Sequence, residues 1–229
     1  MIEVRRSEER GPADHGWLKS RHTFSFANYY DPKHMGVSSL RVINDDKVAP
    51  GAGFATHSHR DMEIISFVKR GTIEHKDSMG NIEKLPAGEF QLMSAGTGVT
   101  HSEYNPSDTD PLEFLQIWII PNEQGVTPGY QQKRFEDKDG LQLVVSPQGE
   151  KGSLSVHQDA YLYHLRLQEG QSDQHELAPN RTVYIHAISG AIEVDGVTLK
   201  DGDGATIRDV SKLEFKATKQ SEALVFDLP

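Results

Sequence analysis

Two short clusters of histidine and glutamate could bind a metal ion. The stretch GFATHSHRDMEIISF contains His57 and His59, and the stretch SAGTGVTHSEYN contains His101 and Glu103. Residues two apart in a strand point to the same face, so each pair would project together if its segment is extended. A lone His-x-His pair also arises by chance among 11 histidines in 229 residues, so the second cluster decides the interpretation. We predict one metal site formed by His57, His59, His101 and Glu103.

The donor set limits which ion such a site binds. The chain has no cysteine, so any metal must be held by nitrogen and oxygen. Three imidazoles and one carboxylate suit Fe(II), Mn(II), Ni(II), Cu(II) or Zn(II), and they do not suit Ca²⁺, which prefers oxygen ligands alone. An ion that accepts five or six ligands keeps positions for water, dioxygen or a chelating substrate, which is the arrangement that catalysis needs.

The elements that must position these residues read as strands. Short segments rich in β-branched and aromatic residues are separated by Gly, Asp, Asn and Pro. The segment HTFSFANYY alternates in polarity, EFLQIWII is long and mostly apolar, and AIEVDGVTL reads as a hairpin around an Asp-Gly turn. The sequence therefore predicts an all-β fold.

The two halves of the chain resemble each other. Residues 71–89 and 190–203 both read as strand, turn, strand and Gly-acidic turn, although unrelated hairpins can share such turn chemistry. Residues 121–140 are polar and rich in turn residues, so we place the boundary there. The predicted domains are residues 1–135, which bind the metal, and residues 136–229.

The repeat also tests whether the second half has its own metal site. The positions that correspond to His57, His59 and His101 are Glu176, Ala178 and Phe215. None of these is a histidine, so the second half is predicted to lack the ligands and to be structural. We therefore expect the histidines of the second half to be scattered core or surface residues. They are His157, His164, His175 and His186.

Composition excludes several classes of function. The formal net charge is −10, and no basic segment is present to follow a nucleic-acid backbone, so direct nucleic-acid binding is not expected. No apolar run approaches the roughly 20 residues of a membrane helix, and the N-terminus lacks the apolar core of a signal peptide. We expect a cytoplasmic protein that does not enter a membrane. The oligomeric state is left open, and a monomer is compatible with the sequence.

The quoted motifs resemble those of a known superfamily. The segment GAGFATHSHRDMEIISFVKRG resembles the first cupin motif, and GEFQLMSAGTGVTHSEYN resembles the second, with Gly98, His101 and Asn105 at the expected spacing. The His-Ser-Glu variant, with HGWLKSRHTFSFANYYDP before it and LQIWIIP after it, is similar to the pirin branch of the cupins, especially the bacterial proteins assigned as quercetin 2,3-dioxygenases. The similarity covers most of residues 10–135.

The resemblance implies a bicupin, with two antiparallel jelly-roll barrels and one divalent metal ion in the first. In pirins the ligands occupy the positions of His57, His59, His101 and Glu103; Fe²⁺ is the expected ion, and Mn, Ni, Cu, Zn and Co are compatible with the set. Many other cupins take their carboxylate ligand from the first motif, at the position of Glu63. We therefore expect Glu63 either to support the ligands from behind or to be an ordinary strand residue.

Two functions follow from this resemblance. The first is a metal-dependent dioxygenase that opens the central ring of flavonols such as quercetin with O₂, with Glu103 as both ligand and proton acceptor. The second is a non-catalytic metal-binding protein that senses redox state or metal and regulates a protein partner. The aromatic residues near the N-terminus could line a flavonol pocket or could be packed core, and His22 and His75 have no partner at ligand spacing. These aromatic residues are Trp17, Phe24, Phe26, Tyr29 and Tyr30.

Overall fold

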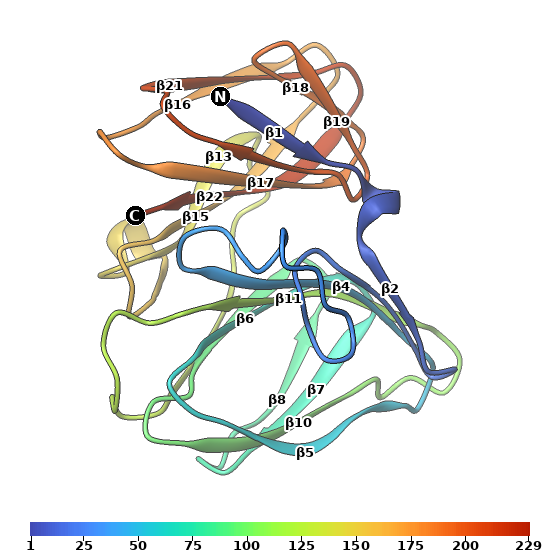
Figure 1. Cartoon of the computed structure of the whole chain (residues 1–229). Coiled ribbons are helices and arrows are strands. Elements are labelled where there is room, and N and C mark those ends of the chain that lie inside the picture. The colour runs from blue at the N-terminus through green and yellow to red at the C-terminus, as the bar shows by residue number, and fades with distance from the viewer. The chain divides into compact units, whose positions relative to one another are not determined.

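The protein is built almost entirely of strands. The computed structural model describes residues 1–229 and contains 22 strands, with two short 3₁₀ helices, η1 (Ser7–Glu9) and η2 (Glu150–Gly152). No helix in it is long and apolar enough to span a membrane. The chain forms two compact units, each made of a seven-stranded and a four-stranded sheet (Figure 1). The all-β prediction is confirmed.

We call the first unit the N-terminal barrel; it comprises residues 11–135 and 156–158. Its large sheet has the order β12-β9-β6-β11-β4-β3-β2 and its small sheet has the order β5-β10-β7-β8, with antiparallel pairing throughout. The strands are β2 (Gly11–Asp14), β3 (Leu18–His22), β4 (Leu40–Val48), β5 (Gly53–His59), β6 (Glu63–Arg70), β7 (Thr72–Asp77), β8 (Ile82–Pro86), β9 (Glu89–Ser94), β10 (Val99–Tyr104), β11 (Leu112–Ile119) and β12 (Gly129–Arg134).

The interior of the N-terminal barrel is layered. Successive inward residues of β11 show the layers, because Phe114 lies in one apolar cluster, Gln116 follows it, and Trp118 packs against a second apolar cluster. Between the two clusters lies a layer of buried polar side chains. It includes Ser20, Asp46, Ser66, His75, Gln91, His101, Glu103 and Gln116. Buried polar groups are costly unless they are paired or needed for function, so this layer marks the part of the barrel where chemistry is expected.

We call the second unit the C-terminal barrel; it comprises residues 1–10, 136–155 and 159–229. Its sheets have the orders β1-β20-β17-β22-β15-β13-β14 and β16-β21-β18-β19, and only the β13–β14 pairing is parallel. The strands are β1 (Ile2–Arg5), β13 (Gly140–Ser146), β14 (Leu154–Ser155), β15 (Tyr161–Leu167), β16 (Ser172–Glu176), β17 (Thr182–Ser189), β18 (Ala191–Val194), β19 (Val197–Lys200), β20 (Gly204–Ile207), β21 (Lys212–Ala217) and β22 (Ser221–Leu228).

The small sheets of the two barrels have the same strand order. Strand β21 takes the place of β10 and β16 takes the place of β5, so each barrel repeats the other's plan. The inward side chains of β21 are Leu213, Phe215 and Ala217, which are fully buried in one apolar cluster. The interior that holds polar residues in the N-terminal barrel is therefore filled by hydrocarbon in the C-terminal barrel.

The compact units differ from the predicted domain ranges in two places. Strand β1 pairs with β20, with Ile2 opposite Ile207, so the first ten residues belong to the C-terminal barrel. Residues 156–158 instead belong to the N-terminal barrel. A local sequence pattern does not report either difference, because each depends on hydrogen bonds between segments far apart in the chain. Figure 1 shows β1 in blue beside the orange and red strands of that barrel.

A buried ion-pair network in the C-terminal barrel makes its stability depend on pH. The Asp227 carboxylate accepts hydrogen bonds from His175 Nε2 at 2.9 Å and Arg181 Nε at 2.6 Å. Burial raises the pKa of Asp227, but the hydrogen bonds from His175 and Arg181 outweigh burial and hold the pKa below its usual range. Ionised Asp227 therefore contributes stability above the unfolded-state pKa of about 3.9, and this contribution is lost as the pH falls through the lower folded-state value.

We predict that Asp227→Asn lowers the free energy of unfolding by about 2 kcal/mol at pH 7, because the mostly buried Arg181 side chain then keeps only the largely exposed Asp159 as a carboxylate partner. The difference from wild type should shrink as the pH falls from about 5 towards 2. Urea unfolding at several pH values measures both effects, and Asp201→Asn, on an exposed residue of the same barrel, is the control. A deficit that stays constant across this pH range would contradict the assignment.

Candidate metal centre

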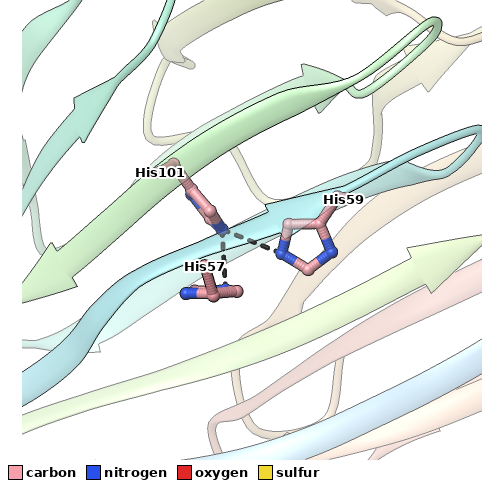
Figure 2. A group of neighbouring side chains, drawn as sticks. All are labelled: His57, His59 and His101. Carbon is pink, nitrogen blue, oxygen red and sulfur yellow. Dashed lines mark hydrogen bonds between the residues drawn. The ribbon is translucent and has the colours of Figure 1, made fainter.

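Three histidines converge in the N-terminal barrel. His57 and His59 lie two apart on β5, and His57 is directly opposite His101 on β10. Because directly paired residues of neighbouring strands share a face, all three side chains project to the same side of the small sheet. Figure 2 shows their rings pointing toward one another from the two strands. Ligand atoms of the three lie within 4.8 Å of one another.

A bulge in β5 sets the position of His57. His101 pairs with His57, but Glu103, two residues on, pairs with Phe54, so three steps on β5 match two on β10. Such a bulge bends the strand and redirects side chains. Gly53 permits the close approach of the two strands beside it, since a Cβ there would lie 2.3 Å from the Glu103 carbonyl oxygen.

The spacing of the three nitrogens fits a metal ion. His101 Nε2 lies 3.0 Å from His59 Nε2 and 3.1 Å from His57 Nε2. Nitrogens bound at about 2.1 Å to one ion, at right angles to each other, are separated by about 3 Å. His57 Nδ1 donates to the Ala55 carbonyl oxygen at 2.8 Å, which leaves His57 Nε2 unprotonated and directed at the cluster. Unprotonated nitrogens at these distances repel unless they share a proton or a cation.

Burial keeps the imidazoles of His59 and His101 neutral. It lowers the pKa of His59 to about 4, with a further lowering from His57. It lowers the pKa of His101 to about 3, with further lowering from His57, His59 and His75. Neutral imidazole is the form that binds metal, so near neutral pH the cluster presents lone pairs without having to lose protons.

Glu103 lies behind His101, deeper in the polar layer. It is only 3% exposed, and one carboxylate oxygen lies 3.4 Å from Ser66 Oγ. Burial raises the pKa of Glu103 to about 7, with a further rise from the nearby charge of Asp46. A ligand oxygen of Glu103 lies within 4.8 Å of nitrogens of His75 and His101. His101 thus belongs to both groups of potential ligands, one with His57 and His59 and one with His75 and Glu103.

His75 is a site residue that the sequence analysis missed. It is fully buried on β7, opposite Glu103, and its Nε2 lies 2.8 Å from Asp77 Oδ2. The expectation that His75 has no partner at ligand spacing is wrong, because the pairing of β7 with β10 supplies one. The only sequence signal was the spacing of His75 and Asp77, which are two apart and so share a strand face.

Asp46 was also missed. It is 2% exposed and accepts a hydrogen bond from Ser20 Oγ at 2.5 Å. Burial raises the pKa of Asp46 to about 7, although the hydrogen bond from Ser20 opposes the rise. The polar layer therefore contains two buried carboxyl groups, Asp46 and Glu103, and the charge of Asp46 raises the cost of ionising Glu103. No motif in the sequence distinguishes Asp46 from Asp45 beside it, which is only partly buried.

Glu63 does not lie behind the ligands. It is three residues from Ser66 on β6, so its side chain points to the opposite face from the one that contacts Glu103. Its carboxylate accepts a hydrogen bond from Ser94 Oγ at 2.9 Å and lies 3.2 Å from His157 Nδ1. The possibility that Glu63 supports the ligands from behind is therefore wrong, although the residue is buried and hydrogen-bonded.

The remaining histidines of the second half have other partners. His164 Nε2 lies 2.5 Å from Glu222 Oε1, and His175 contacts Asp227. No group of three or more His, Asp or Glu residues at ligand distance occurs in the C-terminal barrel.

We predict that His164→Gln and His175→Gln each retain the metal content of the wild type, measured by elemental analysis of purified protein. A loss of half the metal in either variant would reveal a second site.

The aromatic residues considered for a flavonol pocket are dispersed in the structure. Trp17 packs against Phe54, Phe24 is buried, and Tyr30 is exposed to solvent. Phe26 is connected to the histidine cluster through Trp118, whose ring contacts both Phe26 and His59.

The sequence matches family models over both barrels. Residues 3–119 match the model described as Pirin, and residues 143–228 match the model described as the quercetinase C-terminal cupin domain. The chain belongs to the pirin family. The two barrels described above are accordingly a pirin bicupin, as the sequence motifs predicted.

Relatives of this pirin extend over its full length. It is 54% identical to a protein named quercetin 2,3-dioxygenase from Escherichia coli strain K12, covering 100% of this chain and 99% of the relative. It is 39% identical to a pirin-like protein from Caulobacter vibrioides, covering 99% of each chain. A crystal structure of the bacterial pirin YhhW from Escherichia coli in complex with nickel(II) is 54% identical, with a TM-score of 0.98, covering 100% of this chain and 99% of the other.

Proposed function

We propose that this pirin is a metal-dependent dioxygenase that cleaves flavonols such as quercetin. The observation that carries the proposal is the convergence of three imidazoles beside a buried carboxylate, with His101 Nε2 3.0 Å from His59 Nε2 and 3.1 Å from His57 Nε2. Its full-length relative from Escherichia coli carries the name of this activity. The proposed ligands are His57, His59, His101 and Glu103, and Fe²⁺ is the ion that we expect in the cell. A cytoplasmic location also stays a prediction.

The chain's own residues have separate tasks in this proposal. The three histidines hold the ion, which when bound supplies a chelating position and Lewis acidity for the two adjacent oxygens of a flavonol. Glu103 takes the proton from the flavonol 3-hydroxyl group, which makes the substrate electron-rich at the carbon that O₂ attacks. Ring cleavage then breaks the C2–C3 and C3–C4 bonds of the flavonol, so that both oxygen atoms of O₂ enter the ring-opened ester acid and C3 leaves with its own oxygen as carbon monoxide.

The layers of the barrel favour this chemistry. The cluster of Ile64, Met93, Ala95 and Val99 lies beside the histidines and is shielded from solvent, so it limits the access of water to a reactive, deprotonated substrate. Burial, and then the nearby charge of Asp46, raise the pKa of Glu103, which gives it a higher proton affinity than a solvent-exposed glutamate has.

Turnover by purified protein tests the proposal. Metal-loaded protein should consume quercetin and O₂ in equal amounts and release carbon monoxide, and removal of the metal by a chelator should abolish all three signals. Anaerobic mixing should give binding without loss of the flavonol. Metal-loaded protein that binds one equivalent of ion but shows no O₂ uptake would contradict the enzyme and favour the metal-sensing regulator.

A further inference from the structure

An aromatic corner lies beside the histidine cluster. The ring of Trp118 on β11 meets the ring of His59 edge to face, with centroids 5.1 Å apart. The ring of Phe26 also meets the ring of Trp118 in a T-shaped arrangement, with centroids 5.4 Å apart. Phe26, His59 and Trp118 are all partly exposed, so together they form an accessible wall next to the predicted metal position. We call these three residues the aromatic corner.

Trp118 has a hydrogen-bond donor that the protein does not use. Its indole Nε1 is shielded from solvent and has no acceptor within the protein. Buried tryptophan N–H groups usually find a partner, since an unpaired buried donor costs about 1–3 kcal/mol. The ring is held only by contacts with other side chains, which include the apolar cluster of Ile64, Met93 and Val99.

We infer that the aromatic corner contacts the bound substrate and that Trp118 donates its indole N–H to an oxygen of a flat aromatic ligand. The inference rests on the proposed function, and it adds a residue that binds the substrate without holding the metal. An aromatic ligand offers ring faces and edges to Phe26 and Trp118, as aromatic pairs prefer. An oxygen on that ligand gives the indole N–H the acceptor that it lacks. Phe26 packs on Trp118 and is partly exposed, so a shift of this side chain would give a ligand access to the indole.

The chain's two tryptophans allow a direct test by NMR. Protein labelled with ¹⁵N and loaded with diamagnetic Zn(II) should show two indole N–H signals, from Trp17 and Trp118, and Trp17→Phe identifies them. Adding quercetin without O₂ should move the Trp118 indole proton downfield, as formation of a hydrogen bond does, and leave Trp17 in place. Quercetin that binds while the Trp118 signal stays unmoved would overturn the inference.

Binding measurements separate the ring from its N–H group. Trp118→Phe keeps an aromatic ring but loses the donor, so we expect quercetin to bind about fivefold more weakly. Trp118→Leu also loses the ring, so we expect about tenfold weaker binding or more. The matched control is Trp17→Phe, which should bind quercetin as the wild type does. Metal content, measured in parallel, should be unchanged in all three variants.

The kinetics of the same variants distinguish this inference from the proposed function. If the proposed function and this inference both hold, Trp118→Phe raises KM and changes kcat little, because Trp118 binds the substrate but does not take its proton. Wild type that binds quercetin without turnover contradicts the proposed function alone. Normal turnover and normal KM in Trp118→Leu contradict the inference alone. Wild type that does not bind quercetin at all overturns both.

Discussion

Glu103→Gln is expected to keep the metal and to lose flavonol cleavage by about 10²-fold or more, the usual scale for removing a positioned general base. Glutamine retains the shape of the side chain and an oxygen for the ion, but it lacks the negative charge and basicity that remove the substrate proton. The measurement is kcat for quercetin at equal metal content. A variant with full metal and unchanged turnover would remove Glu103 from the chemistry.

Glu63→Gln is the matched control for this experiment. Glu63 is a buried glutamate of the same barrel, but it points away from the face that contacts Glu103 and is engaged by Ser94 and His157. We expect its turnover to stay near wild type, even if some stability is lost. Equal loss of turnover in Glu63→Gln and Glu103→Gln would show that the effect is a general consequence of disturbing buried carboxylates in the barrel.

His57→Ala and His59→Ala should each lower metal affinity by about 100-fold or more, because each deletes a nitrogen that contacts the ion directly, whereas loss of a supporting partner costs 10–100-fold. Calorimetric titration of each variant with Ni(II) measures the change in metal affinity. His75→Gln is the informative comparison, since His75 belongs to the second group of possible ligands. If His75→Gln loses the ion and His57→Ala retains it, the metal lies deeper in the barrel than we propose.

The sequence predicted the parts of the site that depend on local spacing. The period of two in a strand placed His57 with His59 and His101 with Glu103, and the structure brings the three histidines together as expected. The absence of histidine at Glu176, Ala178 and Phe215 predicted no metal site in the second barrel, and Phe215 lies in an apolar interior. The role of the three histidines and Glu103 as metal ligands stays a prediction, which the variants above test.

Features that depend on strand register could not be predicted. His75 meets Glu103 only because β7 pairs with β10 in one register, and a shift of one residue would turn His75 to the other face. Asp46 differs from its neighbour Asp45, which is only partly buried, through its burial beside Ser20. Glu63 and Ser66 are three residues apart, so their side chains lie on opposite faces of the strand. This alternation shows that Glu63 points away from the site only once the contact between Ser66 and Glu103 is known.

The pairing of β1 with β20 has a consequence for how the chain folds while it is being synthesised. Ile2–Arg5 is synthesised about 200 residues before its partner Gly204–Ile207, which corresponds to about 10–40 s at typical rates of translation. During that time residues 11–135, which supply all the strands of the N-terminal barrel, are synthesised. Strand β1 can therefore pair with β20 only after the strands of the other barrel have been made.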